Sequence, residues 1–169
     1  MAWVESCDSD CYIFVTTPPD LKKPVFIQPA SVQQIAALPY ISVGGQAQVL
    51  LITSRERGRW ILPKGWPVKG LSYAEAAARE AEEEAGVIGS ISAEPFGHFD
   101  YQKRMSKGYE VRCSVLVYPL QVVEHRLDWK ERGDRQMRWC TLLEAAGQVD
   151  DAGLCHLLQS AHQTFPTVP

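Results

Sequence analysis

The segment from Ser72 to Val87 reads SYAEAAAREAEEEAGV, and its pattern decides how the rest of this 169-residue chain is interpreted. Ser72 and Glu75 have the spacing of a capping box, which predicts the start of a helix. Gly86 can adopt the left-handed conformation that ends one, so the helix is expected to run to Ala85. One stripe of this helix is formed by Ala74, Ala77, Ala78, Ala81 and Ala85. Side chains this small predict close packing against a sheet.

A second stripe of the same helix carries three carboxylates. Glu80, Glu83 and Glu84 are i, i+3 and i+4 neighbours that repel one another, and they stand in the last turn, where the helix dipole disfavours anions. Arg79 can pair with Glu83 but cannot neutralise all three carboxylates, and Glu82 points elsewhere. A solvated acidic surface is the simplest interpretation, but a hard divalent cation such as Mg²⁺ would remove the repulsion. Loss of Glu84 is therefore expected to leave the metal-free protein no less stable.

Length and composition exclude several classes of protein. A chain with 46% hydrophobic and 22% charged residues can form one domain with a sizeable core. It has no apolar run of membrane-spanning length and no secretory signal pattern, and its net charge of -3 gives no general attraction to nucleic acid. Its five cysteines include no Cys-x-x-Cys pair, so reduced thiols are favoured. We expect a cytoplasmic protein without a membrane or nucleic-acid partner; its oligomeric state stays open.

The segments around the helix predict a mixed sheet. Alternating or branched apolar residues indicate strands at 34–42, 47–53, 60–62, 87–91, 96–101, 111–118 and 136–140. Turns are expected at Gly44-Gly45 and at 106–108. A second capping box, Thr141 with Glu144, opens a helix through Ala146, and a last helix reaches about Gln163. The proline-rich residues 1–30, where a short strand can form at 12–16, are interpreted as an extension of a domain at 31–165.

Basic residues flank the acidic helix on both sides. Those before it are Arg55, Arg57, Arg59, Lys64 and Lys69, and those after it are Lys103, Arg104, Lys107 and Arg112. Guanidinium and ammonium groups beside metal-binding carboxylates suit a polyanion that is bridged to a metal ion. Ordinary basic loops remain the alternative. Trp66 either stacks on a base or serves packing.

Gly65 together with the run from Arg79 to Val87, REAEEEAGV, resembles the Nudix box G-x5-E-x7-R-E-U-x-E-E-x-G-U, in which U is aliphatic. One position departs, because Leu71 stands where the motif has its first glutamate. Residues 49–55, 59–63 and 128–139 further resemble the diphosphoinositol polyphosphate and diadenosine polyphosphate phosphohydrolases, and the loop form Pro-Lys-Gly-Trp-Pro resembles bacterial relatives of that branch. The resemblance covers about residues 31–160.

The resemblance implies an α/β/α sandwich with a mixed sheet. It also implies that the loop and helix of the box bind Mg²⁺ or Mn²⁺. Carried over residue by residue, the metal ligands would be Glu80, Glu84 and the carbonyl oxygen of Gly65. Glu83 would be a ligand or the base that orients water, and Arg79 would hold the carboxylates in place. Because Leu71 replaces a residue that supports the loop, its presence bears on loop geometry rather than on metal binding.

The resemblance also implies contacts with a polyphosphate substrate. Ser54 and Arg55 would contact its phosphates, and weaker analogies add Lys64, Arg104, Arg112 and Arg135. The general base can also come from a loop outside the box, for which the candidates are Glu124, Glu131 and Asp134.

The expected function is metal-dependent hydrolysis of a phosphoanhydride bond in a nucleoside diphosphate-linked small molecule. Dinucleoside polyphosphates or diphosphoinositol polyphosphates are the first choice of substrate. The alternatives are ADP-ribose, a sugar nucleotide, the 5′ end of RNA, or a module that binds a nucleotide without cleaving it. Because degenerate boxes mark such sensors, the intact Glu80, Glu83 and Glu84 argue against that last alternative.

Overall fold

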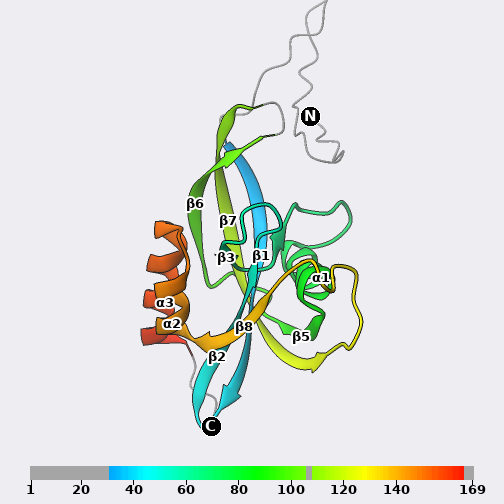
Figure 1. Cartoon of the computed structure of the whole chain (residues 1–169), viewed down its shortest axis with the longest axis vertical. Coiled ribbons are helices and arrows are strands. Elements are labelled where there is room, and N and C mark those ends of the chain that lie inside the picture. The colour runs from blue at the N-terminus through cyan, green and yellow to red at the C-terminus, as the bar shows by residue number, and fades with distance from the viewer. Residues whose placement is uncertain (1–30, 106–107, 166–169) are drawn as a thin grey trace, which may run out of the picture.

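The computed structural model describes residues 31–105 and 108–165 (Figure 1). The expected extension at 1–30, its strand at 12–16 and part of the turn at 106–108 lie outside these residues. The described strands form one eight-stranded sheet. They are β1 (Ser31–Val43), β2 (Gln46–Thr53), β3 (Trp60–Ile61), β4 (Lys64–Gly65), β5 (Val87–Ile91), β6 (Gly97–Arg104), β7 (Glu110–His125) and β8 (Met137–Thr141).

The sheet is mixed, as expected. The order along its main path is β3-β2-β1-β7-β5, with β4 paired to β1, β6 to β7 and β8 to β2. Strands β1 and β7 run parallel, from Ser31 opposite Arg112 to Tyr40 opposite Gln121, whereas the other pairs are antiparallel. The long parallel pair forms the middle of the sheet, to which the shorter strands attach.

Helices cover both faces of the sheet, which confirms the α/β/α sandwich. Helix α1 (Tyr73–Ala85) lies on one face, and α2 (Leu142–Gln148) and α3 (Ala152–Thr164) lie on the other (Figure 1). Side chains of a strand alternate between the faces, so Ile35 packs towards α1 while its neighbour Ala36 packs towards α2 and α3. Within the described residues no helix has both the length and the apolar character needed to cross a lipid bilayer.

Helix α1 begins and ends as the sequence predicts. The Ser72 hydroxyl accepts a hydrogen bond from the Glu75 amide at 3.2 Å, the Glu75 carboxylate accepts one from the Ser72 amide at 2.7 Å, and Gly86 has a φ of 65°. The buried face is displaced from the predicted stripe by about 40°. Ala76 is buried, Ala78 is half-buried, and Glu84 is buried with the alanines. The carboxylate stripe therefore adjoins the buried face of the helix.

Strand β7 is longer than predicted. It continues to His125 because its far end pairs with β5, while its near end pairs with β6. This far half of the strand carries exposed residues such as Val123 and Glu124, so it lacks the alternation that marks a half-buried strand. The extension places the start of the β7–β8 loop, residues 126–136, beside the end of α1.

Candidate metal and phosphate site

The first part of the site is a close approach between α1 and strand β4. Gly65 pairs with Ile35 of β1, and this places its backbone directly against the Glu80 carboxylate. A Cβ atom at position 65 would collide with the oxygens of that carboxylate. A side chain there would displace Glu80, so glycine keeps the carboxylate beside the peptide backbone. Burial and the charges of Glu84, Glu83 and Glu131 raise the pKa of Glu80 from 4.5 to about 7.

Glu84 is the most deeply buried carboxylate of the three and is only 8% exposed. One of its oxygens accepts a hydrogen bond from the Lys64 amide at 2.9 Å, and the other accepts one from the Arg135 guanidinium. Burial raises the pKa of Glu84, although the positive charge of Arg135 opposes that shift. From the sequence, Glu84 was expected in a repulsive patch without a partner. In the structure it pairs with the buried guanidinium of Arg135.

Glu83 faces more open surroundings than Glu84. Its two oxygens accept hydrogen bonds from Arg79, at 2.7 Å, and from Lys130. The hydrogen bond from Lys130, followed by that from Arg79, lowers the pKa of Glu83. Glu82 pairs instead with Arg126, in agreement with the expectation that it points away from the other three.

The carboxylates do not yet form an enclosed cluster. Among residues 31–105 and 108–165, no three His, Cys, Asp or Glu side chains converge closely enough to hold a metal ion in this arrangement. The donors nevertheless fit a hard cation, because the carboxylates of Glu80 and Glu84 and the carbonyl of Gly65 all offer oxygen.

The cations around α1 come largely from the β7–β8 loop. The Arg126 amide donates to the Gly86 carbonyl at 2.8 Å, and the Glu131 amide donates to the Glu83 carbonyl at 3.2 Å. Trp129 lies on Gly86, where an added Cβ would come within 2.6 Å of the indole ring. The loop thus docks on the C-terminal end of a helix whose own last turn has no basic residue. The contributions of Arg126 and Lys130 were missed at the sequence level, because only the distant pairing of β5 with β7 brings them here.

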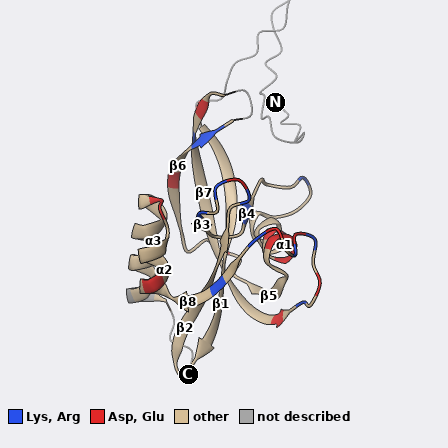
Figure 2. Cartoon of the chain, in the orientation of Figure 1, with Lys and Arg blue, Asp and Glu red and all other residues tan. Residues whose placement is uncertain are grey.

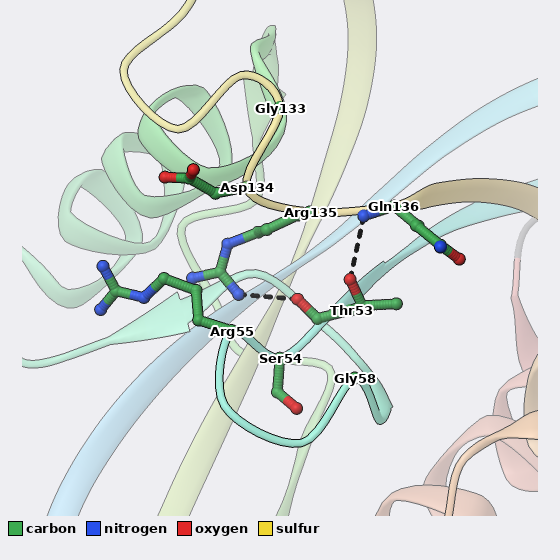
Figure 3. Close-up of a pocket in the computed structure, with 8 residues that line it drawn as sticks. All are labelled: Thr53, Ser54, Arg55, Gly58, Gly133, Asp134, Arg135 and Gln136. Atoms are coloured by element: carbon green, nitrogen blue, oxygen red, sulfur yellow. Dashed lines mark hydrogen bonds between the residues drawn. The ribbon is translucent and has the colours of Figure 1, made fainter.

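A depression of about 330 Å³ opens next to this loop, between the end of β2 and residues 133–136 (Figure 3). Ser54, Arg55, Asp134 and Arg135 line it. The Ser54 hydroxyl accepts a hydrogen bond from the Arg59 amide at 3.0 Å, which fixes the turn after β2. Arg55 is 65% exposed along its side chain and reaches Glu131 at 3.3 Å. The depression therefore presents an accessible guanidinium beside Glu131.

The other basic candidates lie elsewhere. The Lys64 ammonium is held by the Tyr101 hydroxyl at 3.3 Å and by Gln34 at 3.4 Å, and burial lowers its pKa to about 8. Arg104 and Arg112 are exposed on the β6–β7 hairpin, where Arg112 pairs with Asp100 at 2.6 Å. Figure 2 shows both acidic and basic segments along this hairpin. None of the three lines the depression.

The remaining candidates differ in exposure. Glu124 is exposed on β7, and Asp134 is exposed at the depression, whereas Glu131 is only 14% exposed and bonds to both Arg55 and Arg135. Trp66 packs against the core on the side of the sheet covered by α2 and α3, and its ring lies 5.3 Å from the Lys103 ammonium. Leu71 is 37% exposed at the start of α1.

Comparisons with known proteins agree with this architecture. A model of the NUDIX domain matches residues 33–158. Nudix hydrolase 12 (mitochondrial) of Arabidopsis thaliana is 36% identical over 101 residues, which cover 58% of this chain and 50% of that protein. Nudix hydrolase 18 (mitochondrial) of the same plant is 32% identical over 126 residues, covering 70% and 69%. The chain spans about half the length of most of these curated relatives.

Solved structures show the same fold. The Ap4A hydrolase of C. elegans superimposes with a TM-score of 0.59 at 22% identity, covering 80% of this chain and 99% of that one. The NUDIX domain of Shewanella oneidensis NrtR, solved with ADP ribose, gives 0.61 at 16% identity, covering 82% and 91%. At these identities the likeness concerns the fold alone. The NUDIX model matches most of this chain, and helix α1, which carries the Nudix box glutamates, packs against Gly65 as the motif requires. This chain therefore belongs to the Nudix family.

Proposed function

We propose that this protein is a divalent-cation-dependent hydrolase that cleaves phosphoanhydride bonds in nucleoside diphosphate-linked small molecules. The observation that carries the proposal is the position of Glu80 and Glu84, whose carboxylates lie against the backbone of Gly65 and Lys64. In this proposal Glu80, Glu84 and the Gly65 carbonyl hold Mg²⁺ or Mn²⁺, with Glu83 beside them. The bound cation would polarise the phosphorus and neutralise the phosphate oxygens.

The other side chains are assigned by their positions around the depression. Arg55 and Ser54 line it, so we assign them to the phosphates, which a guanidinium can bind through two parallel hydrogen bonds. Arg79 holds Glu83. For the base that accepts a proton from water we favour Glu131, because it shares a hydrogen-bonded network with Glu84 through Arg135. Within the described part of the chain, the carboxylates of Glu124 and Asp134 do not bond to that network, so these two residues are the second choices.

Dinucleoside polyphosphates and diphosphoinositol polyphosphates are the proposed substrates. The support is the exposed Arg55 at the rim of the depression, together with the resemblance of residues 49–55 and 59–63 to that branch. The fold shared with the C. elegans Ap4A hydrolase is consistent with this choice. The fold shared with NrtR makes ADP-ribose the competing ligand, either cleaved or only bound.

The test is cleavage of a substrate panel, with the products separated and identified by chromatography, in the presence of Mg²⁺, of Mn²⁺ and after exhaustive chelation. The panel contains a diadenosine polyphosphate, a diphosphoinositol polyphosphate, ADP-ribose, a sugar nucleotide and a 5′-triphosphorylated RNA. We expect turnover only with metal, and the highest kcat/KM for one of the first two. Full turnover after chelation would overturn the mechanism, and the highest kcat/KM on ADP-ribose would overturn the substrate class. Binding of ADP-ribose without turnover of any compound would indicate a sensor.

A further inference from the structure

Arg135 connects three separate parts of the fold. Its Nε donates to Glu131 of the β7–β8 loop at 2.7 Å, its Nη1 donates to the Thr53 carbonyl of β2 at 2.8 Å, and its Nη2 donates to Glu84 of α1. Figure 3 shows the bond to Thr53 at the wall of the depression. The side chain is only 5% exposed, so the guanidinium is engaged inside the protein.

Arg55 offers a direct contrast, because it shares the carboxylate of Glu131 with Arg135. Arg55 reaches one Glu131 oxygen at 3.3 Å from a side chain that is 65% exposed, whereas Arg135 takes the other oxygen from a buried position. Two arginines therefore flank the Glu131 carboxylate, of which Arg55 is exposed to solvent and Arg135 is buried. An exposed side chain can turn to a ligand at little cost, whereas Arg135 would have to leave three hydrogen bonds.

We propose that Arg135 is a positioning residue that fixes the Glu84 carboxylate for the metal ion, and that it does not contact the substrate phosphates. This inference rests on the proposed function. The Lys64 amide and Arg135 hold the two Glu84 oxygens from different sides. Each carboxylate oxygen has a second lone pair, which remains for a cation. Groups that orient a ligating carboxylate in this way are commonly needed for full metal affinity.

Lysine could not replace Arg135 in this role. A guanidinium is a planar fork with five N–H groups in fixed directions, so one side chain can serve acceptors on three elements. An ammonium on a flexible stem keeps the charge but cannot hold the same three acceptors in one geometry. Arg135→Lys should therefore retain the neutralising charge near Glu84 and Glu131 while losing part of the orientation.

The experiment compares Arg135→Ala, Arg135→Lys and the matched control Arg55→Ala in the full chain. Three quantities are measured: the Tm of the metal-free protein, the Kd for Mn²⁺ alone at low temperature, and kcat and KM with diadenosine tetraphosphate. For Arg135→Ala we expect a Tm lower by about 10 °C, because removing one partner leaves buried carboxylates uncompensated. We also expect a Kd for Mn²⁺ raised about tenfold or more, with a lower kcat and a KM within about threefold.

The control variants should separate charge from orientation. Arg135→Lys should lie between the wild type and Arg135→Ala in its Kd for Mn²⁺. Arg55→Ala should raise the KM while leaving the metal-free Tm and the Kd for Mn²⁺ unchanged, because that arginine is exposed. If Arg135→Ala does not fold, Arg135→Lys carries the test, and a Kd within about twofold of the wild type overturns the proposal.

Three other results would also overturn it. A raised KM with an unchanged Tm and Kd would show that Arg135 contacts phosphate. A lower Tm with an unchanged Kd would show a purely structural role. Tighter Mn²⁺ binding would show a cation that competes with the metal. If the wild type itself binds no Mn²⁺, the proposed function fails as well. If the wild type binds Mn²⁺ and turns over substrate, but the Arg135 variants keep the wild-type Kd and kcat, only the inference about Arg135 fails.

Discussion

Helices α1 and α2 begin alike and end differently. Ser72 with Glu75 and Thr141 with Glu144 form complete capping boxes, in which the hydroxyls accept from the amides at 3.2 and 3.3 Å. The last turn of α2 carries no charge, whereas the last turn of α1 carries Glu82, Glu83 and Glu84 against the helix dipole. The common beginnings obey local rules of helix formation. The acidic end of α1 breaks those rules, and the loop at 126–136 supplies the compensating cations.

The strongest test of this contrast compares Glu84→Gln with Glu82→Gln in the metal-loaded protein. Both residues are in the last turn and both pair with an arginine, but Glu84 is buried against the Lys64 amide while Glu82 faces Arg126 at the surface. Glutamine keeps the shape and removes the anion that a hard cation needs. We expect kcat for diadenosine tetraphosphate to fall on the order of 10³-fold for Glu84→Gln and only a few-fold for Glu82→Gln. Equal losses of kcat in the two variants would show that the face of α1 on which a glutamate lies does not decide whether it binds the metal.

In the metal-free protein, substitutions of Glu84 and of Glu80 should change the Tm in opposite directions. Glu84→Gln removes the anion that faces buried Arg135, so we expect a Tm lower by about 5 °C. The raised pKa of Glu84 implies an ionisation cost as well, but leaving the buried Arg135 without its partner outweighs that cost. This reverses the expectation from sequence, which saw only repulsion between glutamates. Glu80 has a raised pKa, so its ionisation costs stability as the pH rises from 4.5 to about 7.

Glu80→Gln removes this cost of ionisation. The variant should therefore melt a few degrees higher than the wild type at pH 8, and the difference should vanish below about pH 4.5, where Glu80 is protonated in both states. Thermal melting in chelator across this pH range measures both variants. Shifts of the same sign for Glu80→Gln and Glu84→Gln at pH 8 would contradict the contrast between an unpaired and a paired carboxylate.

Features that depend on neighbouring residues could be predicted from the sequence. Both capping boxes, the Gly86 cap and the bounds of β5 are confirmed, because each depends on a short run of residues. The contacts of Glu84 could not be predicted, since Arg135 is 51 residues away and reaches it only through the sheet. The displaced buried face of α1 has the same origin, because the approach of β4 to Glu80 turns the acidic stripe inward.

The two capping boxes provide a smaller test, because they should be equivalent despite the different roles of their helices. Ser72→Ala and Thr141→Ala each remove the oxygen that accepts from the N3 amide. We expect each to cost about 1 kcal/mol of unfolding free energy, or a Tm lower by about 2–4 °C. Ser72→Thr and Thr141→Ser keep an accepting hydroxyl and should stay closer to the wild type. A much larger loss for Ser72→Ala alone would mean that the start of α1 carries more than a cap.

The smallest effect is expected at Leu71, where the Nudix box has its first glutamate. Leu71 is 37% exposed, and its amide donates to the Val68 carbonyl at 3.1 Å, so its backbone is held whatever the side chain. A carboxylate here would remain solvated and would stand just before α1, where the helix dipole favours an anion. Leu71→Glu should therefore keep the Tm within about 2 °C of the wild type and change kcat less than any variant of Glu80 or Glu84.

Leu71→Gln is the matched control, because glutamine has the same shape as glutamate without the charge. A Tm that falls equally in both variants would mean that the leucine packs more tightly than its exposure indicates. A rise in kcat with glutamate but not with glutamine would show that the missing charge, rather than the geometry of the loop, limits this protein.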